Sequence, residues 1–260
     1  MPKAVIIIFL LFTTSVLHAQ SWEIGAYGGA AGYMGDLNQT NPLKLSGPAI
    51  GGMLRYNFNG YLSARVNYTY GTIAGADSTS SNIQQRTRNL SFSTSLSELS
   101  IIGEFNFFKY IPSISSSYFS PYIYLGIGTT TFIPHANYQG QTYDLTTLQT
   151  EGQTKPYSNN AISIPYGVGI KYNFSGAWTI AADIGYRNTN TDYLDDVSGL
   201  YPNKANLSPL SAALSDRSGE KTGVYTGTGG TQRGDFRGFD TYLFVGFTVS
   251  FTFISSKCYY

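Results

Sequence analysis

Charged residues are scarce in this chain. Asp, Glu, Lys and Arg make up only 12% of its 260 residues, about half the usual share in soluble domains. After residue 19 the chain carries 15 basic and 15 acidic residues, so this part is formally neutral. No basic tail or patch is present, which argues against nucleic acid as a partner.

Cysteine and histidine are nearly absent as well. Cys258 is the only cysteine, which excludes an intrachain disulfide. It lies too near the C-terminus, and too far from histidine, to indicate a metal site or a nucleophile. A lipid-anchored protein is not expected either, since no cysteine follows the N-terminal segment. No cofactor is predicted.

Long apolar runs are confined to the N-terminus. Lys3 precedes an apolar and small-residue stretch at 4–17, and Ala19 offers a small residue at a cleavage point. This pattern predicts a cleaved secretory signal peptide over residues 1–19, and therefore export. The alternative, an uncleaved membrane anchor, would need about 20 apolar residues. The loops of residues 20–260 show no internal repeat or linker, so this part is expected to be one domain.

Aromatic residues and glycine are abundant, with 22 Tyr, 16 Phe and 29 Gly. Apolar and polar residues alternate with a period of two, as they do in β-strands. In the stretch "YLSARVNYTY", for example, Leu62, Val66 and Tyr68 fall on one face and Arg65 falls on the other. This alternation predicts eight strands, at 22–33, 47–57, 61–72, 92–107, 121–133, 161–173, 177–188 and 240–253.

Strand length separates the two architectures that could hold such strands. A soluble sandwich buries its apolar face, whereas a membrane barrel turns that face to lipid. The expected strands run to about ten residues or more, as tilted membrane strands do. Aromatic residues also lie near strand ends on the apolar face, as in interfacial girdles; they are Trp22, Tyr56, Tyr61, Tyr172 and Trp178.

Connection lengths favour the membrane barrel too. "NFNGY" and "NFSGAW" are tight turns and "FKYIPSISSSYFS" is moderate, whereas the other rim carries long polar loops at 34–46, 73–91, 134–160 and 189–239. Short periplasmic turns and long extracellular loops are typical of outer-membrane proteins. The sequence therefore predicts an all-β fold, an eight-stranded antiparallel transmembrane β-barrel of OmpA/OmpX-like architecture in the outer membrane. A soluble sandwich is the alternative.

The charged residues within strands all fall on the lumen face. They are Glu23, Arg55, Arg65, Glu98, Glu104, Lys171, Asp183 and Arg187. An eight-stranded barrel is just wide enough for side chains to fill it, and an unpaired buried charge costs several kcal/mol. We expect a charge-paired plug, in which Arg65 is the first partner to check for Glu98 and Glu104. The alternative is a proton or ion path.

Polar loop residues give weaker signals. His135, with a loop serine, could form a Ser-His-acid site of the kind found in outer-membrane lipid A deacylases, although no nucleophile motif surrounds it. Clustered carboxylates in "TDYLDDV" could hold calcium, or could cap turns and pair with Arg217 or Arg233. The triplet "RGD" is either adhesive or part of a flexible loop. The loop motif residues are Asp192, Asp195, Asp196, Asp216, Arg217, Arg233 and Asp235.

Many short stretches together carry a family resemblance. They include "MGDLN" (34–38), "RYNFN" (55–59), "EFNFF" (104–108), "FSPYIYLGIG" (119–128), "TEGQ" (150–153), "SIPYGVGIKYN" (163–173), "GYRNTNTDYLDDVSG" (185–199), "LSDRS" (214–218) and "QRGD" (232–235). On these residues the chain resembles the PorG-like outer-membrane barrels of the type IX secretion system of Bacteroidetes, from the first strand to the last.

The resemblance implies a non-enzymatic role. PorG-like barrels are associated with the periplasmic ring of the secretion machinery, which comprises a lipoprotein and a partner protein, so a component or anchor of that machinery is expected. No catalytic residues come with the family. Folding together of "TEGQ", "YLDD" and "LSDRS" would explain why motifs gather in the outer loops. The alternatives are a surface barrel for adhesion or envelope integrity, and a small lipid-modifying enzyme.

Overall fold

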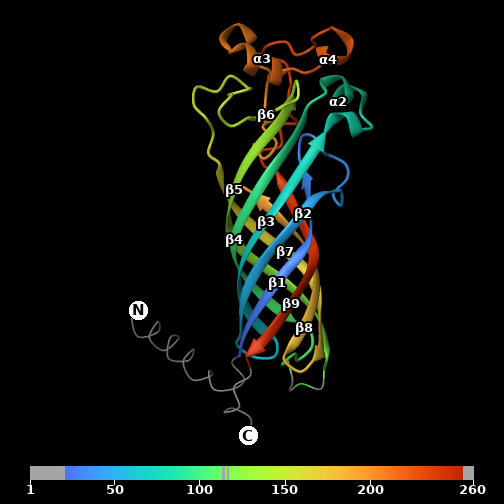
Figure 1. Cartoon of the computed structure of the whole chain (residues 1–260), viewed down its shortest axis with the longest axis vertical. Helices are drawn as coiled ribbons and strands as arrows, with labels where there is room; N and C mark the ends of the chain where they lie inside the picture. Colours follow the sequence, from blue (N-terminus) through green and yellow to red (C-terminus); the bar gives the residue numbers. More distant parts are fainter. Residues whose placement is uncertain (1–20, 113–114, 116, 254–260) are drawn as a thin grey trace, which may run out of the picture.

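The chain forms a closed barrel of eight long antiparallel strands (Figure 1). The computed structural model describes residues 21–112, 115 and 117–253, so the expected signal peptide and Cys258 lie outside the described residues. The eight barrel strands are β1 (Ser21–Met34), β2 (Leu45–Asn57), β3 (Leu62–Ala76), β4 (Ser91–Asn106), β5 (Phe119–Tyr138), β7 (Asn160–Ser175), β8 (Trp178–Thr189) and β9 (Thr241–Phe253). Neighbours along the chain pair with one another, and β1–β9 pairing closes the ring. The predicted eight-stranded antiparallel barrel is confirmed.

Two strands run further than the sequence predicts. β3 continues to Ala76 and β5 to Tyr138, where the predicted ends were residues 72 and 133. Along these extensions the outward residues are the small Ala74 and Ala76 on β3 and the polar His135 and Asn137 on β5, so the large apolar side chains that mark the alternation are missing there. The β3 extension pairs with β4 in register. The β5 extension pairs with β4 at residues 134–135 and with the short strand that follows at residues 135–138, so this side of the barrel stands higher than the rest.

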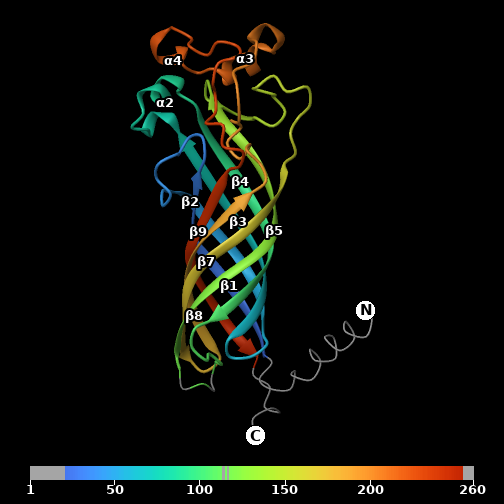
Figure 2. The same ribbon diagram turned by 180° about the vertical axis from the view of Figure 1, so that it is seen from behind.

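The long loops form an outer cap over the taller end of the barrel (Figures 1 and 2). We define the outer cap as residues 35–44, 77–90, 139–159 and 190–240. It holds the short strand β6 (Gln141–Asp144) and the helices η1 (Asp77–Thr79), α2 (Ile83–Arg88), η2 (Lys204–Asn206), α3 (Pro209–Ser215) and α4 (Gly219–Thr222). None of the helices in the described part of the chain is both long and apolar enough to cross a membrane.

β6 is the one strand that the sequence did not predict. It pairs with the end of β5 through a two-residue turn. Both turn residues have positive φ, 49° at Gln139 and 79° at Gly140, and this combination matches the twist of the flanking strands in a hairpin. The glycine tolerates that conformation without cost.

The outward face of β4 changes character at one point. Leu99, Ile101 and Phe105 are exposed apolar side chains, at 50%, 61% and 42%, whereas the outward residues nearer the cap are all serine: Ser91, Ser93, Ser95 and Ser97. Apolar residues at the same level cover the outside of the other strands as well. A continuous apolar band of this extent fits lipid and not water. The upper edge of the band on β4 therefore lies between Ser97 and Leu99.

Aromatic side chains mark the lower edge of the apolar band. Trp22, Tyr61, Tyr172 and Trp178 are between 45% and 51% exposed, and Trp22 packs against Tyr56 with ring centroids 4.9 Å apart. Such rings suit the boundary between hydrocarbon and water. Both the start of β1 and the end of β9 lie at this end, on the side of the short turns (Figure 1).

Candidate functional site

The eight charged residues of the strands all lie inside the barrel, where each is at most 8% exposed. Glu104 is the centre of this lumen network. One of its carboxylate oxygens lies 3.0 Å from Arg55 Nε and 2.6 Å from Lys171 Nζ. The other lies 3.0 Å from Arg65 Nε. The strand order explains this convergence, since β4 pairs directly with β3, and β2 and β7 are the next strands but one on either side of β4.

The remaining lumen charges extend the same network. Arg55 also reaches Glu23 at 2.6 Å, and Arg65 lies 3.7 Å from Asp183. Above them, Glu98 accepts hydrogen bonds from Tyr242 at 2.6 Å and from Arg187 at 3.2 Å. Both glutamates of "LSELSIIGEFNFF" therefore face the lumen, and each has a cationic partner.

Buried side chains occupy the lumen at the level of these charges. A cavity of about 20 Å³ lies between Tyr27, Arg65, Asp183 and Arg187, which is room for roughly one water molecule. Four acids and four bases neutralise one another in this volume, and neutralisation removes the penalty of burying each charge alone. This geometry supports a structural plug and not an ion path.

A second, apolar plug lies above the charged one, and the sequence analysis missed it. Leu194 and Val197 of the outer cap are 0% and 1% exposed. They pack among inward side chains of the barrel mouth, including Phe92, Leu96 and Phe132. Inward apolar residues at the upper ends of β4 and β5 were the available signal, because a water-filled mouth would not favour them.

The Arg233 side chain forms hydrogen bonds to three other loop segments. Its Nη1 donates to Glu151 at 2.8 Å and to the backbone carbonyl of Asp196 at 2.6 Å. Its Nε donates to the carbonyl of Ser215 at 3.1 Å. Glu151 in turn accepts from the backbone N–H groups of Ser198 and Gly199. The segments "TEGQ", "YLDD", "LSDRS" and "QRGD" thus meet at one buried guanidinium.

The other loop motif residues are spread over separate contacts. The "YLDD" aspartates were expected to pair with Arg217 or Arg233. Asp196 lies 3.8 Å from Arg233 Nη2, whereas Arg217 pairs with Glu220 at 2.7 Å. Asp216 pairs with Lys204 at 2.5 Å, and Asp235 with Arg237 at 3.3 Å. Arg233 is 3% exposed, so the triplet Arg233-Gly234-Asp235 does not present its arginine for adhesion.

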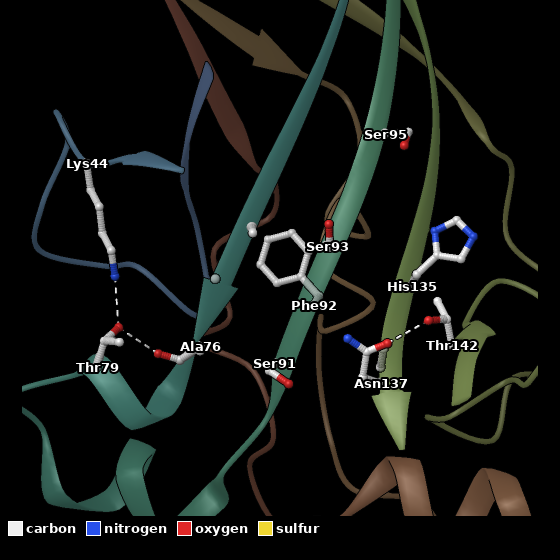
Figure 3. A pocket seen from close by; sticks show the side chains of 13 residues that line it. Lys44, Ala76, Thr79, Ser91, Phe92, Ser93, Ser95, His135, Asn137 and Thr142 are labelled. Atoms are coloured by element: carbon white, nitrogen blue, oxygen red, sulfur yellow. Dashed lines mark hydrogen bonds between the residues drawn. The ribbon is translucent and has the colours of Figure 1, made fainter. Parts of the chain in front are cut away.

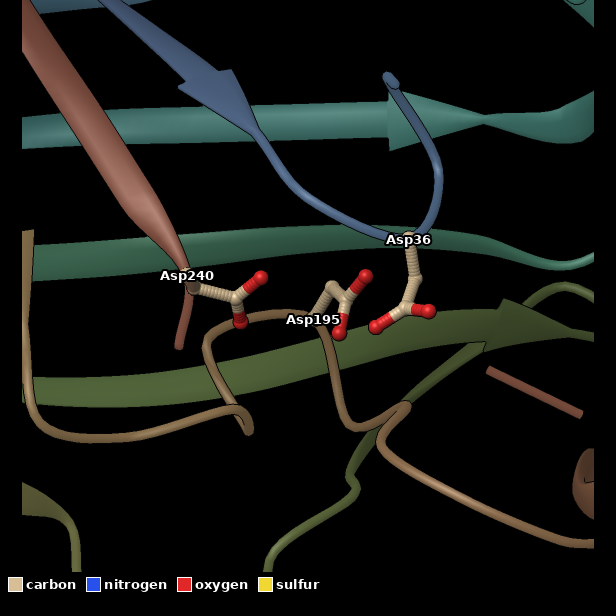
Figure 4. A group of neighbouring side chains, drawn as sticks. All are labelled: Asp36, Asp195 and Asp240. Atoms are coloured by element: carbon tan, nitrogen blue, oxygen red, sulfur yellow. The ribbon is translucent and has the colours of Figure 1, made fainter. Parts of the chain in front are cut away.

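Three aspartates converge in the outer cap, beside the apolar plug (Figure 4). Oxygens of Asp36, Asp195 and Asp240 all lie within 4.8 Å of one another. Asp195 was a candidate from the sequence, whereas Asp36 and Asp240 were missed because they belong to other segments, directly after β1 and directly before β9. Asp192 and Asp196 lie outside this aspartate cluster, so the three "TDYLDDV" carboxylates do not form one site.

Burial and mutual repulsion perturb the aspartate cluster. Burial, together with the nearby Asp235 carboxylate, raises the pKa of Asp36 to about 7. Burial also raises the pKa of Asp195 and of Asp240 well above the usual range, and the other cluster carboxylates add to this effect. Tyr33 donates its hydroxyl to Asp195. A second contact places the same hydroxyl 3.2 Å from Asp240.

His135 on β5 lines a groove of mixed polar and apolar character on the outer wall, of about 620 Å³ (Figure 3). The groove lies above the apolar band and includes Lys44, Thr79, Ser93 and Asn137. Lys44 donates to Thr79 at 2.8 Å. Within the described part of the chain, no hydrogen bond joins His135 to a serine of this groove, so a Ser-His-acid arrangement is not assembled.

No curated protein sequence matches this chain. Among solved structures, it is similar to the N-terminal β-barrel domain of Pseudomonas aeruginosa OprF, with 13% identity, 90% of this chain and 97% of that chain covered, and a TM-score of 0.38. Its identity to Neisserial surface protein A is 11%, with 90% of this chain and 97% of that chain covered and a TM-score of 0.42. Its identity to the E. coli outer membrane protein W is 15%, with 89% of this chain and 97% of that chain covered and a TM-score of 0.40.

A family match covers most of the chain. The matched segment runs over residues 2–231, and it includes β1 to β8 and most of the outer cap. Asp240 and β9 lie beyond the end of the matched segment. The chain belongs to the family described as a domain of unknown function, DUF6089.

Proposed function

We propose that this protein is a non-enzymatic outer-membrane component or anchor of the type IX secretion machinery, which binds the periplasmic ring lipoprotein and its partner. The proposal rests on the resemblance to PorG-like barrels. The observation that carries it is the doubly plugged lumen, in which charged and apolar side chains fill successive levels of the bore. A barrel filled in this way acts through its surface and not as a conduit.

The periplasmic rim is the surface that a ring beneath the membrane could reach. Three aromatic side chains lie in or beside the connections at this end: Phe58 is 49% exposed, Phe108 51% and Tyr118 65%. Exposed aromatic residues of this kind are enriched in protein interfaces. They are therefore the first residues to vary in a search for ring contacts.

A deletion strain tests the proposal directly. We expect loss of the gene to abolish export of cargo that carries the carboxy-terminal secretion signal, and re-expression to restore it. A photo-crosslinking residue at 108 or 118 should capture a ring subunit, and the same residue at Phe236 in the outer cap should not. Normal export in the deletion strain, or crosslinks to the ring from the outer cap alone, would refute the proposal.

The alternative is a surface barrel for adhesion or envelope integrity. The observation that favours it is the ordered outer cap, which carries exposed Phe236 and Phe239, 60% and 63% exposed. Under this alternative the deletion strain exports its cargo normally but changes in adhesion or permeability. The same strain tests the enzyme hypothesis, for which altered lipid A would be the sign.

A further inference from the structure

The aspartate cluster combines three carboxyl side chains with nearly complete burial. Asp36 and Asp240 are each 1% exposed and Asp195 is 2% exposed. Among the described residues, no lysine or arginine forms an ion pair with any of the three. Arg88 is the nearby cation, but its guanidinium is held by both oxygens of Asp77, at 2.7 Å each. Unpaired charges at such depth are destabilising unless something else neutralises them.

One oxygen of the cluster has no partner at all. Asp36 Oδ2 is buried and receives no hydrogen bond from any described residue, whereas Oδ1 accepts from the backbone N–H of Asp235. Figure 4 shows the Asp36 carboxylate directed toward Asp195. A buried acceptor without a donor calls for a ligand or a proton at that position.

A proton and a bound cation would need different groups around the carboxylates. Protons would convert the carboxylates into donors, yet the groups fixed around them are mostly donors already. Leu194 N–H donates to Asp240 at 2.9 Å and Val197 N–H donates to Asp195 at 2.9 Å. These backbone groups stabilise ionised carboxylates, which in turn attract a cation.

The spacing and the donor atoms fit calcium. Two oxygens that each lie about 2.3–2.6 Å from one Ca²⁺ can be at most about 5 Å apart, and the cluster oxygens lie within 4.8 Å of one another. All the candidate ligands are oxygens, with no histidine or cysteine, which suits a hard cation and not zinc or copper. Loop segments that adapt to the ion also suit the flexible coordination of calcium.

We propose that Asp36, Asp195 and Asp240 bind one Ca²⁺ ion, which joins the outer cap to the mouth of the barrel. The ion would link the segment after β1, the segment after β8 and the residue before β9. Gly35 protects this arrangement, because a Cβ at that position would collide with Asp240 Oδ1 and the Tyr33 hydroxyl. The site is independent of any periplasmic partner.

The test uses the full chain, purified and folded in detergent micelles. Calorimetric titration of the EDTA-treated and dialysed protein with CaCl₂ should show one ion per chain, with a dissociation constant of about 10⁻⁴–10⁻³ M, as for other extracellular sites. Asp36→Asn and Asp195→Asn should each weaken binding at least tenfold. Glu220→Gln removes a carboxylate that lies outside the cluster and should leave binding unchanged.

A second measurement needs no variant. Protease cleavage within residues 190–240 of the wild type should slow several-fold when CaCl₂ replaces EDTA, while the barrel stays intact by its heat-dependent mobility in gels. The proposal is overturned if the wild type shows no binding heat and no calcium-dependent protection. It is equally overturned if Asp36→Asn and Asp195→Asn bind calcium as the wild type does. Protection by low pH alone, without a calcium effect, would show that shared protons neutralise the cluster.

Discussion

Arg233 and Glu151 form an ion pair 2.8 Å long between segments that are 82 residues apart in the chain. Both side chains are buried, at 2% and 7% exposure. The pair fixes where the loop after β6 meets the loop before β9, and the surrounding backbone carbonyls and N–H groups complete the contacts of both side chains. The Arg233 guanidinium thus joins several segments of the outer cap.

Arg233→Ala should loosen the outer cap. Removing the cation leaves Glu151 buried without its partner, which costs about 3–5 kcal/mol in comparable cases. We expect rapid cleavage of residues 190–240 by protease, with the barrel intact. Arg237→Ala is the matched control, because the Arg237 side chain is 54% exposed and exposed pairs contribute only about 0–1 kcal/mol. Equal protease resistance of the two variants would contradict the role given to Arg233.

Glu104→Gln should destabilise the barrel itself. The change removes the one carboxylate that contacts Arg55, Arg65 and Lys171 together. Uncompensated cations in the bore should lower the free energy of unfolding by about 3–5 kcal/mol. Urea-induced unfolding in lipid vesicles measures this, with Glu220→Gln as the control. An unchanged midpoint would mean that the lumen network contributes little.

Arginine scanning on β4 should locate the edge of the lipid. Ile101→Arg places a charge on the apolar band and should cost as much as roughly 2–4 kcal/mol, depending on depth. Ser93→Arg lies on the same face of the same strand, but above the band, and should cost almost nothing. Folding yield into vesicles reports both. Similar yields would mean that the proposed edge between Ser97 and Leu99 is misplaced.

The outer cap should weaken as pH rises when no divalent cation is present. Burial raises the pKa of Asp36 to about 7, against 3.8 for a free aspartate, and raises that of Asp192 to about 6. A folded state that holds a proton more tightly than the unfolded state loses stability as pH increases between the two values. Protease susceptibility in EDTA should therefore increase from pH 5 to pH 8. Constant susceptibility would mean that the folded and unfolded states bind equal numbers of protons, and would contradict the raised pKa of Asp36.

The protein should not conduct ions. The lumen network and the apolar plug block the bore at two levels, so removal of the outer cap alone should not open it. Planar bilayers that contain the purified protein should stay silent, both for the wild type and for a variant without residues 198–232. Steady conductance from the wild type would overturn the structural plug.

The sequence was most informative within the strands, where a residue's position in the alternation decides whether it faces the lumen or the lipid. Alternation assigns Glu104 to the lumen because its neighbours on both sides are apolar, and the same alternation places all eight strands. It could not place Asp36 beside Asp240, because loop folding depends on contacts between distant segments. Leu194 shows the same limit, since only the closed barrel provides the apolar mouth into which it packs.

The tip of the β6 hairpin has a practical consequence. Residues 190–240 appear in the sequence as the natural place to insert a foreign peptide, but they are tied into the outer cap by buried contacts. Gln139 and Gly140 form an exposed two-residue turn, and a Cβ at Gly140 would meet nothing within 4 Å. An epitope for surface display therefore belongs at this hairpin, where a longer excursion leaves the fold undisturbed.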